Sequence, residues 1–327
     1  MPSSRRTFAL SIAAVLAAGA SFQAHAQTFP APGKPIRIVV PFSPGGQAEV
    51  IGRRFGMHLS ESMGVPVIID TKPGANTGIG ALEVQRAAPD GHTLLLTNGL
   101  THVTNPMMRP KLSYDASKFT PIFQIVGSST VLIANTSRPF NNVQELVAYA
   151  RANPGKLSYA SIGTGSTAHL LGELFAQKTG TTMTHVPYKG SGQATQDLIG
   201  GQVDIMFDGF GTAIGSIATK HVKPIGVATR ERNDAMPDVP TIAEQGVQGI
   251  TSEGYIGIFG PANMPPDVVT RLNNELQKTL AMASVEKFLR GTGNTPAGGS
   301  ADQFAQKIAA EVKVWGPLVK RLNIVLE

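Results

Sequence analysis

The expected architecture rests on one stretch of sequence, Ile36-Arg37-Ile38-Val39-Val40-Pro41-Phe42-Ser43-Pro44-Gly45-Gly46-Gln47-Ala48. Its first five residues are mostly β-branched and predict a short buried strand. The proline- and glycine-rich part that follows predicts a tight loop. Beyond the loop, apolar residues recur every four positions and predict an amphipathic helix that ends at Gly64: Ile51, Phe55, Leu59 and Met63.

The same alternation of strands and helices continues along the chain. Short apolar runs at 67–69 and 93–96 follow the first strand at similar intervals, a spacing typical of βαβ units. The pattern restarts after residue 130, with strands predicted at 157–160, 203–207 and 225–228. We therefore expect an α/β fold of two units, each a mostly parallel sheet flanked by helices. Two helix starts have the spacing of capping boxes: Asn141 with Gln144, and Ser300 with Gln303.

The composition limits the classes of protein to consider. At 327 residues the chain is long enough for two domains, and 42% hydrophobic residues allow a large core. The absence of cysteine excludes a disulfide scaffold, a thiolate metal site and a cysteine nucleophile. The net charge of +6 comes from basic residues that are scattered rather than clustered, so we expect no nucleic-acid partner.

The first 26 residues have the order of a secretory signal peptide. Arg5 and Arg6 precede an apolar run from Phe8 to Ala20, and Ala24-His25-Ala26 fits a small-x-small cleavage site. We therefore expect export to the periplasm with cleavage after Ala26. The paired arginines also resemble a twin-arginine signal, so the export route stays open. An uncleaved anchor helix is the alternative, but the apolar run is too short to span a bilayer.

Motifs for catalysis and cofactor binding are absent or incomplete. The sequence has no G-x-S-x-G, H-E-x-x-H or G-x-x-x-x-G-K motif. Residues 163–168 have the shape of a dinucleotide fingerprint, but the acid expected about twenty residues later is missing. His169 and Glu173 have metal-like helix spacing, yet two ligands do not make a site. We expect no catalytic residue, no cofactor and no metal.

Two loops nevertheless have the chemistry of an anion cradle. Residues 41–48 and 163–167 each follow a predicted strand and open a predicted helix. Glycine lets the backbone approach a ligand, and a helix start offers unpaired N–H groups and a positive dipole end. Taken alone, each loop could equally be an ordinary turn. One such loop in each unit favours a small anion held between the two units.

An ordered series of short segments spans almost the whole predicted mature chain. The segments are Lys34-Pro35-Ile36-Arg37, Val39-Val40-Pro41-Phe42, Pro44-Gly45-Gly46, Pro73-Gly74-Ala75, Ala88-Pro89-Asp90-Gly91, Asn105-Pro106, Pro154-Gly155-Lys156-Leu157, Tyr159-Ala160-Ser161, Gly163-Thr164-Gly165-Ser166 with His169-Leu170, His185-Val186-Pro187-Tyr188-Lys189-Gly190, Gly200-Gly201-Gln202-Val203-Asp204 and Pro237-Asp238-Val239-Pro240-Thr241. This series resembles the Bug family, which comprises the periplasmic solute-binding proteins of tripartite tricarboxylate transporters.

The resemblance implies a two-domain type II periplasmic-binding-protein fold with the ligand cleft between the domains. It places residues 27–129 and 251–327 in domain 1 and residues 130–250 in domain 2, with hinge segments near 127–131 and 251–256. It also implies a small carboxylate or dicarboxylate ligand, delivered to the membrane permease subunits of a tripartite tricarboxylate transporter. We expect a monomer that is not an enzyme.

The resemblance also implies that both glycine-rich loops contact the near carboxylate of the ligand. Thr101, Thr164 and Asp208 are expected at the far end of the cleft, although Asp208 equally suits a cap on the next helix. The chain has Gly46-Gln47-Ala48-Glu49 where the family usually has Gly-Gly-Thr-Asp, so no particular solute is carried over. The predicted ligand-binding residues are Phe42, Ser43, Gly45, Gly46, Gln47, Ala48, Thr101, Thr164, Gly165, Ser166, Thr167 and Asp208.

Two other functions stay open from the sequence. A secreted α/β hydrolase or transferase acting on a carboxylated substrate would need a nucleophile–base pair or a metal site in the cleft. His102, His169 and His185 lie near predicted loops, but none belongs to a catalytic motif with a carboxylate partner. A sensory domain that reports its ligand to a membrane kinase is compatible with solute binding.

Overall fold

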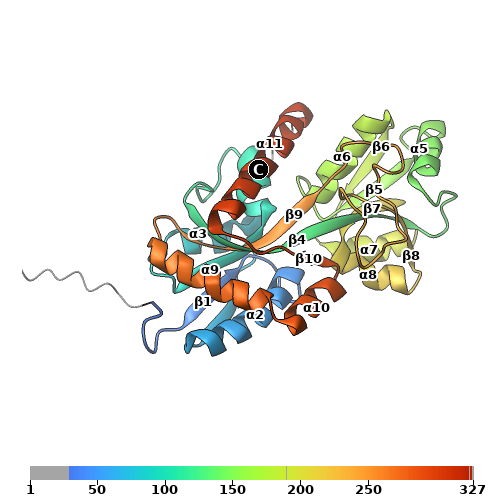
Figure 1. Ribbon diagram of the computed structural model, residues 1–327. Coiled ribbons are helices and arrows are strands. Elements are labelled where there is room, and N and C mark those ends of the chain that lie inside the picture. The colour runs from blue at the N-terminus through green and yellow to red at the C-terminus, as the bar shows by residue number, and fades with distance from the viewer. Residues whose placement is uncertain (1–28, 189, 324, 326–327) are drawn as a thin grey trace, which may run out of the picture.

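The structure, a computed structural model, describes residues 29–188, 190–323 and 325. The predicted signal peptide and its cleavage site lie outside these residues. Figure 1 shows two lobes, each made of strands covered by helices, with strands that run from one lobe into the other. The first lobe contains the start and the end of the described chain, and the middle of the chain forms the second.

The first lobe contains β1 Ile36–Val40, β2 Val67–Thr71, β3 Thr93–Asn98, β9 Glu253–Pro261, β10 Asn294–Pro296 and the first part of β4 Phe119–Asn135. The strand order is β2-β1-β3-β9-β4, and β10 pairs with β4. β1, β2 and β3 are parallel, as predicted. β9 is antiparallel to β3 and β4, and β10 is antiparallel to β4, because the chain returns to this lobe from the second one.

Alternate residues of β1 enter two cores, and this places helices on both faces of the sheet. Ile36, Ile38 and Val40 share a core with α2 Gln47–Met63, α9 Pro266–Leu280 and α10 Ala283–Gly291. Val39 points to the other core, with α3 Gly78–Gln85 and α11 Ala301–Leu322. The connections contain η1 Ala75–Thr77, η2 Leu100–Thr104 and α4 Asn105–Met108.

The second lobe repeats the plan. It contains the last part of β4 with β5 Leu157–Ser161, β6 Met183–Pro187, β7 Ile205–Gly209 and β8 Val222–Val227. β5 is parallel to β6 and β7, whereas β7 and β8 are antiparallel to β4. The helices are α5 Val143–Ala152, α6 Thr167–Thr179, α7 Ser191–Ile199 and α8 Phe210–Ala218.

Helix starts show where capping could be predicted. Ser300 and Gln303 form the predicted capping box at the start of α11. The box predicted at Asn141 is wrong by one residue, because the N-cap of α5 is Asn142. Glu145 rather than Gln144 makes the reciprocal bond: its carboxylate accepts from the backbone N–H of Asn141 at 2.7 Å. A charged acceptor makes the stronger bond to that N–H group.

β4 belongs to both lobes (Figure 1). It pairs with β9 as far as Ser129 and with β7 and β8 from Thr130 onward. Ile256 of β9 pairs both with β4 and with Asn98 at the end of β3, while Gly209 at the end of β7 pairs with Thr130. The carboxyl ends of β3 and β7 therefore reach the middle of β4 from opposite lobes. The loops that follow these strands lie at the junction of the lobes.

Candidate functional site

The first glycine loop, residues 41–46, joins β1 to α2. Gly45 has a φ of 81°, and the backbone N–H of Gly45 donates to Oε2 of Glu49 at 2.5 Å. Glu49 is buried and also accepts from Nε of Arg53 at 2.7 Å. The Gly45 N–H and Arg53 hold the pKa of Glu49 below its usual range, so this carboxyl is charged at neutral pH. The start of α2 thus has an anion of its own.

The second glycine loop, residues 162–166, joins β5 to α6 with a similar backbone. Gly165 has a φ of 82°, close to that of Gly45. Ser166 is the N-cap of α6, and its Oγ accepts from the N–H of His169 at 3.3 Å. The N–H of Gly165 donates to Nδ1 of His169 at 3.0 Å. Glu49 and His169 are therefore the third residues of their helices, and each holds the N–H of the glycine before the N-cap.

His169 belongs to a stack of three rings beneath the second glycine loop. The rings of His169 and His185 lie 4.0 Å apart and are inclined by 13°, and Tyr159 stacks on His185 at 4.9 Å. Burial lowers the pKa of both histidines to about 4, so both rings are neutral at pH 7. The hydroxyl of Tyr159 donates to Oε1 of Glu173 at 2.5 Å. We call these three rings the imidazole stack.

Ser161 and His185 have the separation of a nucleophile and a base, yet the surroundings do not suit catalysis. Oγ of Ser161 lies 2.7 Å from Nε2 of His185. However, Ser161 is fully buried, and its Oγ also contacts the carbonyl oxygen and the N–H of Gly163 at 3.1 and 3.2 Å. A nucleophile has to reach its substrate. This hydroxyl instead fixes the start of the second glycine loop.

The predicted ligand-binding residues of the two loops differ in exposure. Ser43, Gly45, Thr164 and Thr167 are exposed, whereas Ala48, Gly165 and Ser166 are buried. Phe42 packs against the core of the first lobe. Because Gly45 and Gly165 donate their N–H groups to side chains, they shape the loops. The donors that an α-helix cannot satisfy internally come next along the chain, at the starts of α2 and α6.

Thr101, predicted at the far end of the cleft, is fully buried. Its Oγ1 lies 2.6 Å from Oγ1 of Thr97 and donates to Oγ1 of Thr77 at 3.0 Å. Its carbonyl oxygen accepts from the hydroxyl of Tyr114 at 2.8 Å. Thr101 therefore lies within a hydrogen-bonded cluster inside the first lobe.

Asn105 is the centre of that cluster, which we call the polar hub: Thr77, Thr97, Thr101, Asn105 and Tyr114. The side chain of Asn105 donates to the carbonyl oxygen of Asn76 at 2.6 Å and to the hydroxyl of Tyr114 at 3.2 Å. These bonds hold residues 75–77, whose φ values of 45°, 51° and 77° are rare outside glycine. The hub therefore maintains a strained loop at the end of β2.

Asp208 is buried at the end of β7. Its Oδ1 accepts from Oγ of Ser191 at 2.7 Å and from the N–H of Gly209 at 2.9 Å. Its Oδ2 is buried and has no hydrogen-bond partner among the described residues. Burial raises the pKa of Asp208, and the bonds from Ser191 and Gly209 oppose that shift. Asp208 does not cap α8, because the N-cap of this helix is Gly209 and no side chain makes a capping bond there.

Gln47, directly after the first glycine loop, contacts residues of β10 and α8 that no local sequence motif predicted. Its Nε2 donates to Oδ1 of Asn294 in β10 at 2.7 Å. A Cβ atom placed on Gly211 of α8 would lie 2.9 Å from Nε2 of Gln47 and 2.7 Å from the carbonyl oxygen of Thr292. The first glycine loop, the turn before β10 and the start of α8 therefore meet at the junction of the lobes. Sequence reasoning missed Asn294 and Gly211 because their neighbours are distant in the chain.

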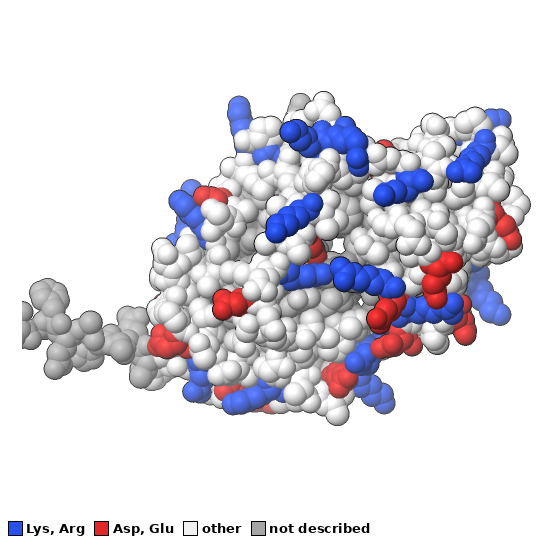
Figure 2. Space-filling view, turned by 45° about the horizontal axis from the view of Figure 1, so that its top comes forward, with Lys and Arg blue, Asp and Glu red and all other residues white. Residues whose placement is uncertain are grey.

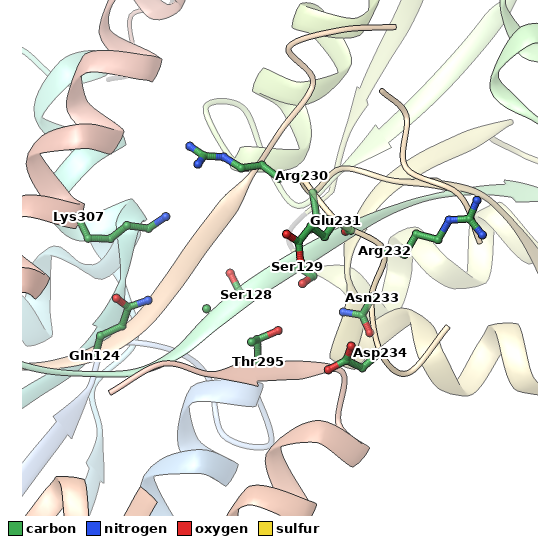
Figure 3. Close-up of a pocket in the computed structure, with 12 residues that line it drawn as sticks. Gln124, Ser128, Ser129, Arg230, Glu231, Arg232, Asn233, Asp234, Thr295 and Lys307 are labelled. Carbon is green, nitrogen blue, oxygen red and sulfur yellow. The ribbon is translucent and has the colours of Figure 1, made fainter. Parts of the chain in front are cut away.

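A hollow of about 520 Å³ lies on the crossing strands, and none of the predicted ligand-binding residues lines it. Figure 3 shows Lys307 of α11 and Arg230, from the segment after β8, extending into it from opposite sides. Asp234 on its edge pairs with Arg290 of α10 at 2.7 Å, a contact that joins the two lobes. The hollow is thus lined by both lobes and carries charges of both signs.

Other features of the described residues limit the chemistry. On the face drawn in Figure 2, basic and acidic side chains are interspersed rather than gathered in one patch. Within residues 29–188, 190–323 and 325, no group of three or more His, Cys, Asp or Glu could hold a metal ion. Over the same ranges, no helix combines the length and apolar character that a membrane span requires.

Two helix-covered lobes, joined by continuous strands and each with a glycine loop at a helix start, define a two-domain periplasmic-binding-protein fold. A protein of R. palustris solved with adipate shares it, with a TM-score of 0.82 and 32% identity over 88% of this chain and 97% of that chain. MatC from Rhodopseudomonas palustris with bound malate has a TM-score of 0.79 and 30% identity, covering 88% of this chain and 99% of that chain.

Family membership follows from two further comparisons. The model for the tripartite tricarboxylate transporter family receptor matches residues 51–324. BugT of Bordetella pertussis is 30% identical over 315 residues, which are 96% of this chain and 96% of BugT. The chain belongs to the Bug family of tripartite tricarboxylate transporter receptors, as the sequence motifs predicted. Proteins of this family are periplasmic solute-binding receptors.

Proposed function

We propose that this protein captures a small carboxylate or dicarboxylate between its two lobes and delivers it to the membrane subunits of a tripartite tricarboxylate transporter. The observation that carries the proposal is the pair of glycine loops, each between the carboxyl end of a parallel strand and the start of a helix. Helix starts attract anions through unpaired N–H groups and the helix dipole. Adipate and malate, the acids in the two related structures, suit such a site.

In this proposal, the near carboxylate lies against the start of α6, and the rest of the ligand reaches across to the first glycine loop. Ser43, Thr164, Ser166 and Thr167 supply hydroxyl donors, and Gln47 supplies an amide. Gly45, Gly46 and Gly165 shape the loops, while Phe42 and Ala48 anchor the first loop to its core. Thr101 supports the cleft from within the polar hub, and Oδ2 of Asp208 is available for a hydroxyl or amine donor of the ligand.

We also propose the domain limits and the closure. β4 changes partners between Ser129 and Thr130, and the chain returns to the first lobe at Glu253. These points support domains at 27–129 with 251–327 and at 130–250. Closure stabilises the complex when contacts between the lobes form only around the ligand. The mature protein, cleaved after Ala26, is proposed to act as a periplasmic monomer.

The test is direct binding. Protein purified from the periplasm is examined by native mass spectrometry for a bound acid, and calorimetric titration then measures its affinities for adipate and malate. We expect a stoichiometric acid or a measurable affinity, and Ser166→Ala and Gly46→Val should weaken it. Ser300→Ala is the matched control, because it removes the N-cap of α11, which belongs to neither glycine loop, at a similar cost in stability of about 1 kcal/mol. No bound acid and no affinity across a panel of carboxylates would contradict the proposal.

A further inference from the structure

The two glycine loops share one backbone arrangement. In each loop a glycine with a φ near 80° donates its N–H to the side chain of the third helical residue, Glu49 in α2 and His169 in α6. The N-caps also agree, with φ and ψ of −75° and 161° at Gly46 and −68° and 160° at Ser166. A side chain that reaches back from the third position in this way fixes the entry of the chain into the helix.

The two side chains differ in charge, and this difference changes how each helix start attracts an anion. Glu49 places a full negative charge at the start of α2, where it offsets the positive end of the helix dipole. His169 accepts the same kind of bond with a neutral ring. Because Nδ1 is the acceptor, the ring proton is on Nε2. The start of α6 therefore keeps its attraction for an anion from outside, whereas the start of α2 has an internal one.

We propose that His169 is a positioning residue that holds the second glycine loop without a charge, and that the ligand's carboxylate is therefore held by the start of α6 rather than by the start of α2. This inference rests on the proposed function and assigns the two loops different roles. The second loop binds the carboxylate. The first loop, through Gln47 and the hydroxyl of Ser43, contacts neutral or donor groups of the ligand.

Burial lowers the pKa of His169 and keeps its ring neutral, and the neighbouring side chains hold the ring in place. His185 of β6 stacks on it at 4.0 Å, so a proton on one ring opposes a proton on the other. Tyr159 of β5 lies 6.5 Å away, and Oε1 of Glu173, one turn further along α6, lies 4.0 Å from Nε2. Glu173 is in turn bonded to the hydroxyl of Tyr159. The stack therefore orients the ring with Nδ1 toward Gly165.

The experiment compares two substitutions of one shape and different charge. His169→Gln keeps a neutral acceptor that can reach back to Gly165, and His169→Glu reproduces the arrangement of the first loop. Affinities for adipate and malate are measured by calorimetric titration at pH 7.5, with melting temperatures for each variant. We expect His169→Glu to bind at least about tenfold more weakly than His169→Gln, because a negative charge at the start of a helix opposes an anion bound there.

Two controls separate charge at the loop from other effects. Thr182→Glu adds the same charge at an exposed position just beyond the other end of α6 and should leave affinity within about twofold. Glu49→Gln should leave affinity unchanged or raise it, because the first loop then loses its internal anion. If His169→Glu does not fold, His169→Leu takes its place. Leucine offers no acceptor, so it should weaken binding relative to His169→Gln.

The outcomes are distinct. Equal affinities of folded His169→Glu and His169→Gln, or a strong loss of binding in Glu49→Gln alone, would overturn the inference while leaving carboxylate binding intact. Equal affinities of His169→Leu and His169→Gln would overturn it in the same way. A wild-type protein that binds neither adipate nor malate nor any acid of the wider panel would overturn the proposed function and this inference with it.

Discussion

The polar hub of the first lobe holds the backbone at 75–77, and the imidazole stack of the second lobe lies beneath the second glycine loop, but the two clusters differ in chemistry. The hub consists of hydroxyls and one amide around Asn105, and at physiological pH none of its members changes charge. The stack contains two neutral histidines whose pKa values are lowered to about 4. The hub therefore keeps the same charge at physiological pH, whereas the charge of the stack changes when the pH falls to about 4.

The largest effect is expected from breaking the hub. Asn105→Ala leaves the carbonyl oxygen and the side-chain amide of Asn76 without their partner, while the hydroxyl of Tyr114 keeps its bond to Thr101. Unsatisfied buried groups cost about 1–3 kcal/mol each, so the free energy of unfolding should fall by roughly 3 kcal/mol. Denaturant titration measures it. Asn274→Ala, on the exposed face of α9, is the control and should change stability by less than about 0.5 kcal/mol.

The stack should be disrupted by one added methyl group. A Cβ atom on Gly172 of α6 would lie 2.2 Å from the ring of Tyr159, so Gly172→Ala should lower the melting temperature with a cost of about 1–3 kcal/mol. Gly215 lies in α8 with no atom within 4 Å of such a Cβ, and Gly215→Ala should be neutral or stabilising by up to about 1 kcal/mol. Similar melting temperatures for the two variants would show that the stack is loosely packed.

The pH dependence sharpens the comparison. His169 and His185 are neutral in the folded protein down to about pH 4, and His102 down to about pH 3, but all three bind protons near pH 6.5 when unfolded. The unfolded state therefore holds more protons below pH 6.5, and stability should fall as the pH decreases from 6.5 to 4. The slope is at most about 1.4 kcal/mol per pH unit for each histidine.

A single variant can distinguish the contribution of His102 in the first lobe from that of the imidazole stack in the second. His102 is stacked on Phe259 at 3.9 Å and its ring nitrogens have no hydrogen-bond partner among the described residues. His102→Phe removes the contribution of His102 and leaves the imidazole stack in place, so denaturant titrations from pH 7 to pH 4 should show a smaller slope than the wild type. An unchanged slope in this variant would mean that His102 is not neutral in the folded state.

The smallest effect concerns a single hydroxyl of the hub. Thr101→Val keeps the shape of the side chain and removes its bonds to Thr97 and Thr77, so stability should fall by about 1 kcal/mol. Because this side chain is buried in the hub, affinity for adipate should stay within about twofold. A larger loss of affinity at unchanged stability would place Thr101 against the ligand.

The fold was predictable from the sequence where signals are local. Periodic apolar residues identified α2 and its end at Gly64, and the ordered motifs identified the two-lobed family fold. The long β4 was not predicted as one strand, because its two parts pair with distant segments of the chain in different lobes, with Glu253 opposite Ser129 and Gly209 opposite Thr130. Pairing of that kind leaves no local pattern.

The candidate site shows the same limit. Glycine and helix-start patterns located both loops, and the four-residue spacing from Gly45 to Glu49 and from Gly165 to His169 was visible in the sequence. Its meaning depended on the left-handed backbone of the two glycines, which spacing alone does not reveal. Asn294, Gly211 and His185 come to the loops from other strands and helices, and only the fold places them there.

The pairing of β4 with strands of both lobes also affects the order in which the two lobes can fold. Its partner β9 begins at Glu253, after the whole second lobe has been made. The parallel pair of β5 and β6 and the pairing of β4 with β7 span shorter lengths of chain, and short spans close faster. The second lobe is therefore an inserted unit that can assemble first, while the first sheet stays open between β3 and β4 until β9 arrives. A chain interrupted shortly before residue 253 would leave those two strands with exposed edges, which are sites of aggregation.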